Sequence, residues 1–175
     1  GGGSVMKPSR RVFVIGLDCA APQLVFHRFL PRLSNLKALM ERGIWGPLRS
    51  TCPPITVPAW TCMMSSRDPG QLGFYGFRNR RSHGYEEMFY ANALALKDRC
   101  VWDYLTEAGL YSIVLSVPQT YPPTPIRGIK VGCFLTPDTN SDYTFPKEFK
   151  EELDGISGGY IIDVDEFRTE NKERL

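Results

Sequence analysis

Histidine is scarce in this sequence, the cysteines are unpaired by spacing, and long apolar runs are missing. The 175 residues include two histidines and five cysteines, and no two cysteines form a CxxC pair. An odd number of cysteines at irregular spacing argues against a disulfide framework and favours a reducing compartment. No apolar run approaches the roughly 20 residues of a membrane-spanning helix, and no basic-then-apolar secretion signal begins the chain. We therefore expect a cytoplasmic protein without a membrane partner.

An excess of either charge is also missing. The 21 basic and 19 acidic side chains give a net charge of +2, which is too small to favour a nucleic-acid polymer as the partner. The 42% hydrophobic and 23% charged residues are typical of a globular domain. Residues 1–10, which open with three glycines and a serine, are interpreted as a tag or linker and an N-terminal extension. Residues 11–175 are interpreted as one folded region.

Alternating strand and helix patterns predict an α/β fold. Residues 12–17 form a short apolar run rich in β-branched side chains, which is typical of a strand buried on both faces of a parallel sheet. Helical spacing follows in 24–30 and 33–43, and a second strand is expected at 44–50. A helix is then expected from Thr56 to about Ser65. This order predicts a sheet covered by helices.

The second half of the chain continues the pattern. A helix that ends at a glycine and leads into a strand is typical of a crossover in a parallel sheet. The expected elements are a helix at 97–108, a strand at 111–117, a rigid proline-rich loop at 118–125, a short strand at 130–135, a helix at 146–153 and a strand at 160–164.

A single threonine, Thr56, stands between prolines at the expected start of a helix. Pro53 and Pro54 disfavour helix before it, whereas Pro58 is tolerated in a first helical turn. The Thr56 side chain and the first N–H groups of the helix should therefore face one spot, which suits an anion. The alternative is that Thr56 is only an N-cap.

An aspartate, Asp18, follows the first expected strand directly. If the strands at 12–17 and 44–50 are neighbours, Asp18 and Thr56 project from the same edge of the sheet, where ligands gather in open α/β folds. A carboxylate beside a hydroxyl suits a divalent metal, which would make the hydroxyl a nucleophile. The alternative is that Asp18 only caps a turn.

Aromatic and then basic residues follow the turn at 67–73. One interpretation of residues 74–81 is a lip that offers stacking surface and positive charge to an anionic substrate. The other is a surface loop whose aromatic side chains pack beneath it. The basic residues are Arg78, Arg80 and Arg81.

Seven motifs, in this order and spacing, resemble the alkaline phosphatase superfamily, near its nucleotide pyrophosphatase/phosphodiesterase branch and its predicted phosphohydrolase/phosphomutase group. They are VIGLD at 14–18, LSNL at 33–36 with MERG at 40–43, GPLRST at 46–51, PPITVPAW at 53–60, DPGQLGFYGF at 68–77, VWD at 101–103 and VPQTYPP at 117–123. The resemblance covers most of residues 11–170. It implies a three-layer α/β/α fold with a mostly parallel sheet, of which this chain would be an incomplete, N-terminal part.

The resemblance also implies roles for single residues. Asp18 would be a metal ligand, and Thr56 would be both a metal ligand and the nucleophile that forms a phosphorylated intermediate. Two divalent ions, zinc or manganese, would act in the full-length enzyme. In the diesterase branch a later asparagine helps to hold the phosphate, and here that offset falls on Phe77, with Asn79 two residues on. Asn79, Arg78 and Arg80 are therefore candidates for substrate binding.

This sequence departs from the family pattern in three places. Cys19 stands where a glycine usually follows the aspartate, and Ser65-Ser66 stands where relatives often end the nucleophile helix with Thr-Gly. The two histidines, His27 and His83, lie in no Asp-His ligand pair, so occupancy of the metal sites in this chain is in question.

These observations favour a metal-dependent phosphohydrolase that acts on a phosphorylated small molecule, with this chain supplying the nucleophile half of the site and nearly inactive alone. Two alternatives stay open: a phosphomutase of the same superfamily, and a non-catalytic binding module that has lost the site. A truncated sheet should also leave unpaired edges, so we expect self-association.

Overall fold

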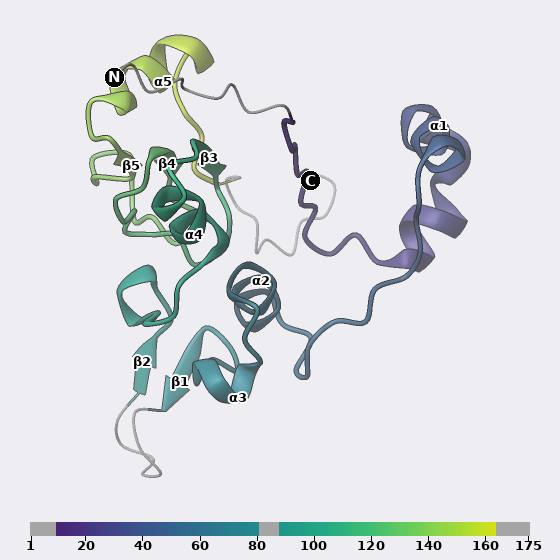
Figure 1. The fold of residues 1–175 in the computed structure, drawn as a ribbon, viewed down its shortest axis with the longest axis horizontal. Helices are drawn as coiled ribbons and strands as arrows, with labels where there is room; N and C mark the ends of the chain where they lie inside the picture. The colour runs from purple at the N-terminus through teal and green to yellow at the C-terminus, as the bar shows by residue number, and fades with distance from the viewer. Residues whose placement is uncertain (1–9, 81–87, 164–175) are drawn as a thin grey trace, which may run out of the picture. The chain divides into compact units, whose positions relative to one another are not determined.

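The structure is a computed structural model that describes residues 10–80 and 88–163 (Figure 1). The chain divides into two compact units, one of residues 1–48 and one of residues 49–175. None of the described helices is long and apolar enough to cross a membrane.

The first unit is helical in its second half. The π-helix η1 (Gln23–Arg28) and the 3-10 helix η2 (Leu30–Arg32) precede α1 (Ser34–Arg42). The helices expected at 24–30 and 33–43 are thus confirmed, the first as two short irregular helices rather than one α-helix. Pro31 lies in the first turn of η2, and its missing N–H cannot continue an α-helix from η1.

The expected strands at 12–17 and 44–50 are wrong, because the structure assigns no strand to either segment. Their apolar side chains are exposed, with Phe13 88% and Leu48 87% accessible. A strand exists only through hydrogen bonds to a neighbour, and neither segment has such a neighbour among the described residues of its unit. The strand expected at 160–164 is absent from residues 160–163 for the same reason, and Val164 lies outside the described residues.

The second unit contains the expected helices with small shifts at their ends. The helix predicted from Thr56 to Ser65 is confirmed at both ends, and those predicted at 97–108 and 146–153 are shorter or displaced. The helices are α2 (Thr56–Ser65), α3 (Pro69–Leu72), the 3-10 helix η3 (Ala93–Ala95), α4 (Val101–Glu107) and α5 (Phe149–Ser157).

Two small sheets complete the second unit. The strands β1 (Arg78–Arg80) and β2 (Met88–Tyr90) pair antiparallel. In the three-stranded sheet, β3 (Ser112–Leu115) is parallel to β4 (Gly128–Val131), and β4 is antiparallel to β5 (Thr144–Phe145). The expected α/β class is confirmed as a mixed α/β fold, but this sheet is small and mixed rather than mostly parallel.

Gly128 is required where β3 and β4 meet. Its φ of 146° lies in a region that L side chains rarely adopt, and an added Cβ would stand 1.8 Å from the Ser112 carbonyl oxygen. Ser112 and Gly128 are partners in the parallel register. The glycine therefore allows the two strands to begin side by side.

Two buried clusters form the core of the second unit. The first holds Cys100, the N-cap of α4, and Trp102 of α4 against Val114 of β3 and Ile126. The second holds Val57 of α2 together with Phe74 and Ala91. Met64 of α2 packs on the first cluster and Leu96 packs on both, so the clusters are connected by neighbouring residues.

Candidate functional site

The structure starts α2 at Thr56. Ile55 is the N-cap, with extended backbone and no side-chain capping bond, so the interpretation of Thr56 as the N-cap is wrong. The chain before it is held by a hydrogen bond from Thr51 Oγ1 to the Pro53 carbonyl oxygen at 2.9 Å. Thr56 is half-buried and occupies the first helical position.

The first turn of α2 presents backbone N–H groups beside Thr56. The N–H of Ala59 donates to the Ile55 carbonyl at 3.0 Å, and Pro58 has no N–H. The N–H groups of Thr56 and Val57 thus precede the first hydrogen bond of the helix. The positive end of the helix dipole lies at the same place, so this helix start can stabilise an anionic group.

Burial along α2 fixes the position of Thr56. Val57 is completely buried in one cluster, and Met64 packs on the other. Two hydroxyls bond back along the helix, Thr61 Oγ1 to the Val57 carbonyl at 2.6 Å and Ser65 Oγ to the Thr61 carbonyl at 2.7 Å. These bonds satisfy the hydroxyl donors within the helix, and Ser65 Oγ also accepts from the Arg67 N–H at 3.3 Å.

Asp18 lies in the first unit, at a turn rather than at the end of a strand. Its Oδ1 accepts a hydrogen bond from the Cys19 N–H at 3.0 Å. Because Asp18 and Thr56 belong to different units, the structure sets no distance between them. Their pairing stays a prediction.

Both departures from the family's glycines fall on left-handed backbone. Cys19 and Ser66 each have a φ of 58°. A residue with a Cβ is strained there by about 1–2 kcal/mol, whereas glycine is not. The two positions therefore have a conformation that glycine adopts without strain, and this chain holds it with cysteine and serine.

In the lip proposed at residues 74–81, Phe74 and Asn79 are buried, whereas Tyr75 and Arg78 are exposed. Asp68 caps α3 by accepting from the Gln71 N–H at 2.8 Å, and Gly73 ends that helix with a φ of 72°. This turn places Phe74 in the core, where it is 1% accessible, so it is not available for stacking. Of the three aromatic residues in the lip, Tyr75 is 53% accessible, whereas Phe77 packs edge-on against Phe134.

The candidate substrate residues differ in accessibility. Asn79 is 4% accessible; its Oδ1 accepts from the Tyr75 N–H, and its Nδ2 donates to the Gly76 carbonyl, both at 2.8 Å. Its carboxamide therefore holds the turn at 75–79. Arg78 is exposed, Arg80 lies in β1, and Arg81 lies outside the described residues. The substrate contacts of Asn79, Arg78 and Arg80 stay predictions.

The donors for a metal ion do not assemble within the described part of the chain. Residues 10–80 and 88–163 contain no group of three or more histidine, cysteine, aspartate or glutamate side chains placed to hold one. Asp18 and Thr56 would supply two ligands, fewer than the usual four or more. The described residues therefore do not fit a metal ion by themselves.

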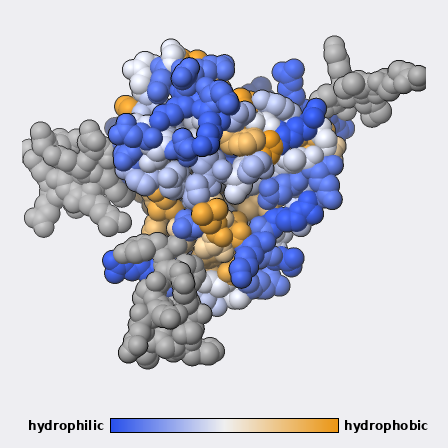
Figure 2. All heavy atoms as spheres, turned by 90° about the vertical axis from the view of Figure 1, so that its left-hand side faces the viewer, coloured by the Kyte–Doolittle hydropathy of each residue, from blue (hydrophilic) through white to orange (hydrophobic). Residues whose placement is uncertain are grey.

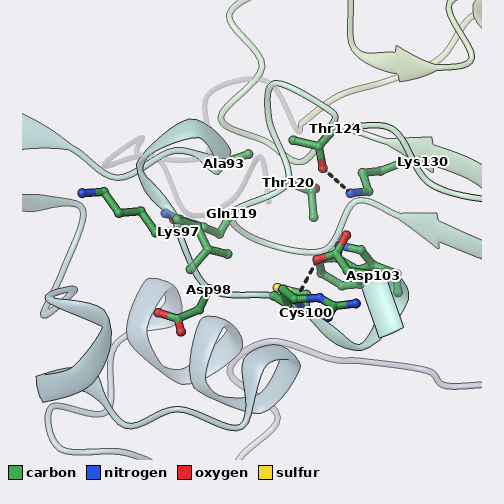
Figure 3. Close-up of a pocket in the computed structure, with 12 residues that line it drawn as sticks. Ala93, Lys97, Asp98, Cys100, Asp103, Gln119, Thr120, Thr124 and Lys130 are labelled. Atoms are coloured by element: carbon green, nitrogen blue, oxygen red, sulfur yellow. Dashed lines mark hydrogen bonds between the residues drawn. The ribbon is translucent and has the colours of Figure 1, made fainter. Parts of the chain in front are cut away.

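A cavity in the second unit was not indicated by the sequence. It measures about 240 Å³ and lies among α4, β4 and the loop at 118–125 (Figure 3). Two titratable groups on its wall have shifted pKa values. Burial lowers the pKa of Lys130, and the nearby Asp103 carboxylate partly offsets this shift. Burial raises the pKa of Cys100 to about 12. A lysine inside an apolar strand pattern is a feature of the sequence that could have pointed to this cavity.

The second unit thus combines a mixed α/β fold with a half-buried threonine at the first position of α2. A comparison with protein families matches residues 12–173 to Type I phosphodiesterase / nucleotide pyrophosphatase. The chain belongs to this family, a branch of the alkaline phosphatase superfamily whose members are phosphoric ester hydrolases and generally depend on metals. Comparisons with curated proteins and with solved structures gave no match.

Proposed function

We propose that this chain supplies the nucleophile half of the active site of a metal-dependent phosphohydrolase, with Thr56 as the nucleophile. The observation that carries the proposal is the start of α2 at Thr56, in a chain of the phosphodiesterase family. A three-layer α/β/α arrangement, as in the alkaline phosphatase superfamily, would place Asp18 beside it. The substrate is a phosphorylated small molecule.

The proposed reaction proceeds in two displacements. Thr56 Oγ1 loses its proton and attacks phosphorus, the bond to the ester oxygen breaks, and the leaving alcohol takes up a proton. Water then attacks the phosphothreonine, the bond between phosphorus and Thr56 Oγ1 breaks, and Thr56 regains a proton as a proton leaves the water. The product is phosphate from a monoester and a phosphate monoester from a diester. The N–H groups at the start of α2 support the anionic phosphoryl group in both steps.

The metal requirement is part of the proposal. Bound divalent ions, zinc or manganese, would supply charge stabilisation and activate the attacking oxygen. Asp18 and Thr56 would be ligands, and the remaining ligands would come from outside the described residues. For this reason we propose that the 175-residue chain alone is nearly inactive.

Replacement of the nucleophile tests the proposal. Thr56→Ala in the complete protein should lower metal-dependent hydrolysis of aryl phosphate mono- and diesters by about 10⁴-fold, the scale of losing a covalent nucleophile. Thr56→Ser, which keeps a hydroxyl, should retain part of the activity. Acid-quenched wild-type enzyme should carry phosphate on Thr56 by mass spectrometry.

The matched control is Thr139→Ala, an exposed threonine outside the helices and strands. Its activity should equal that of the wild type. Full activity of Thr56→Ala would show that the nucleophile lies elsewhere.

Two alternatives are separated by the fate of the phosphate. A phosphomutase would pass the phosphoryl group from Thr56 to another hydroxyl of the substrate, so isomerisation without phosphate release would favour it. A non-catalytic binding module would turn over neither kind of substrate with added zinc or manganese.

We also propose cytoplasmic localisation and self-association of this chain. In β3, which lies at an edge of its sheet, Ile113 and Leu115 are exposed while Ser112 and Val114 are buried. Figure 2 shows apolar residues at the surface between hydrophilic ones on the face drawn there. Exposed apolar surface and strand edges favour association. Sedimentation as a single monomeric species at high concentration would contradict it.

A further inference from the structure

The strand β3 forms one edge of the three-stranded sheet, and its outer side has no strand partner among the described residues (Figure 1). The N–H groups of Ser112 and Ser116 donate to the carbonyl oxygens of the residue before β4 and of its last residue, at 3.0 and 3.1 Å. Because backbone groups alternate in direction along a strand, those of Ile113 and Leu115 point away from β4. The edge therefore offers their N–H and carbonyl groups to another strand.

The side chains at this edge are apolar and exposed on one face. Val114 packs with Trp102 of α4, so the even-numbered residues of β3 face that helix. The odd-numbered residues lie on the other face, where Ile113 is 61% accessible and Leu115 is 57% accessible. Tyr111, which precedes the strand, continues this row and is also exposed. A row of exposed apolar side chains beside a free strand edge indicates a surface for a partner.

The two edges of this sheet differ in their protection against strand pairing. β5 is two residues long and is followed directly by Pro146 and Lys147. Short edge strands, prolines and lysines each hinder the addition of another strand. Residues 110–117, which include β3, contain neither a charged residue nor a proline. The β3 edge is therefore unprotected, whereas the β5 edge is protected.

A second copy of β3 matches this edge in its backbone and in its side chains. When two identical strands pair antiparallel about Val114, Ile113 of one copy stands opposite Leu115 of the other. Both residues point their backbone groups outward, so each such pair can exchange two hydrogen bonds. Their side chains lie on the same face, close enough to pack. β3 is already ordered as a strand, whereas residues 12–17 have no strand conformation and would lose conformational entropy on pairing.

We propose that two copies of this chain dimerise by antiparallel pairing of β3 with β3, with the twofold axis at Val114 and Ile113 of each copy beside Leu115 of the other. The three-stranded sheets of the two copies then form one continuous sheet. Each copy uses its β3 edge once, so the symmetry is closed and association stops at a dimer. The contact is short, so the dimer should be weak and should form at high protein concentration. The inference rests on the self-association proposed above and does not depend on the chemistry of Thr56.

Two double variants of the full chain, compared by sedimentation equilibrium, test this register. Ile113→Lys with Leu115→Lys sets lysine opposite lysine in both pairs and should weaken dimerisation by about 10-fold or more relative to the wild type. Ile113→Lys with Leu115→Glu sets lysine opposite glutamate and should dimerise about 10-fold more tightly than the first variant. Added salt should weaken the dimer of this second variant. Both positions are exposed, so each variant should keep the fold, which circular dichroism checks.

Ile156→Lys is the matched control, because it adds a lysine at an exposed apolar position of α5 and should dimerise as the wild type does. Thr56→Ala should also dimerise normally, so this test and the activity test can fail independently.

Three results would overturn the proposed interface. They are equal dimerisation of the two double variants, wild-type assemblies larger than a dimer, and loss of the dimer in Val14→Lys but not in the β3 variants, which would assign the partner to residues 12–17. Association that persists unchanged in the variant with two lysines would also overturn this interface while leaving self-association in place. A wild type that stays monomeric at high concentration would contradict both.

Discussion

The two units of this chain use apolar residues in opposite ways. No described residue of the first unit, from 10 to 48, is buried, although residues 12–17 are almost entirely apolar. The second unit buries two clusters, around Trp102 and around Phe74. The difference follows from the sequence separation of hydrogen-bond partners. The helices of the first unit need only local hydrogen bonds, whereas an apolar strand needs a partner that is distant in sequence.

Loss of Gly128 should have the largest effect on the second unit. Gly128→Ala places a Cβ against the Ser112 carbonyl at a position with a φ of 146°, so β3 and β4 must separate or shift. We expect a loss of about 4 kcal/mol in the free energy of unfolding, at the upper end for point mutations. Urea unfolding followed by circular dichroism measures it.

Gly155→Ala in α5 is the matched control. A Cβ there meets nothing within 4 Å, and alanine favours helix, so stability should rise by up to about 1 kcal/mol. Equal stability of the two variants would show that the β3–β4 pairing does not hold the second unit together.

A pair of valines compares the units directly. Val114 is 7% accessible in β3 and Val14 is 73% accessible in the first unit. Val114→Ala should cost about 2 kcal/mol through lost burial and the cavity left behind, whereas Val14→Ala should change stability by less than about 0.5 kcal/mol. Chemical denaturation of both variants measures the difference.

An equal cost at Val14 would break the comparison. It would mean that residues 12–17 are buried in solution, as the sequence pattern predicts for a strand in a larger sheet.

Substitutions at the left-handed positions Ser66 and Cys19 should give the smallest effects on stability. Ser66→Gly relieves backbone strain at the end of α2 and should stabilise the second unit by about 0.5–1 kcal/mol after the entropy of glycine is counted. Cys19→Gly makes the same change in the first unit and should leave the main unfolding transition where it is. Differential scanning calorimetry of both variants checks this, and equal shifts would show that the units unfold together.

Local signals in the sequence predicted the helices best. The bounds of α2 follow from Pro53 and Pro54 before it and from the break after Ser65. Each of these signals lies within one or two helical turns of the end that it marks. The strand β3 was also found, because α4 and Gly109 precede it. The segments at 12–17 and 44–50 were misassigned because their side chains are typical of strands but pairing is not encoded locally.

The candidate site was predictable in part. Prolines place Thr56 at a helix start, and the structure confirms that position. The burial of Phe74 and Asn79 was not predicted, because it depends on the capped turn of α3 directing the chain inward. The cavity among α4, β4 and the loop at 118–125 was not predicted either, since its walls come from a helix, a loop and a strand that meet only in the folded chain.

The helix α2 touches both clusters of the second unit, through Val57 near its first turn and Met64 near its last. A small change in packing beneath Met64 would therefore tilt the axis of α2 and displace Thr56 at the opposite end. A random screen for inactive variants of the complete enzyme would then recover substitutions at buried positions that never touch substrate. Such variants would retain a folded chain and would mark the mechanical support of the nucleophile rather than its chemistry.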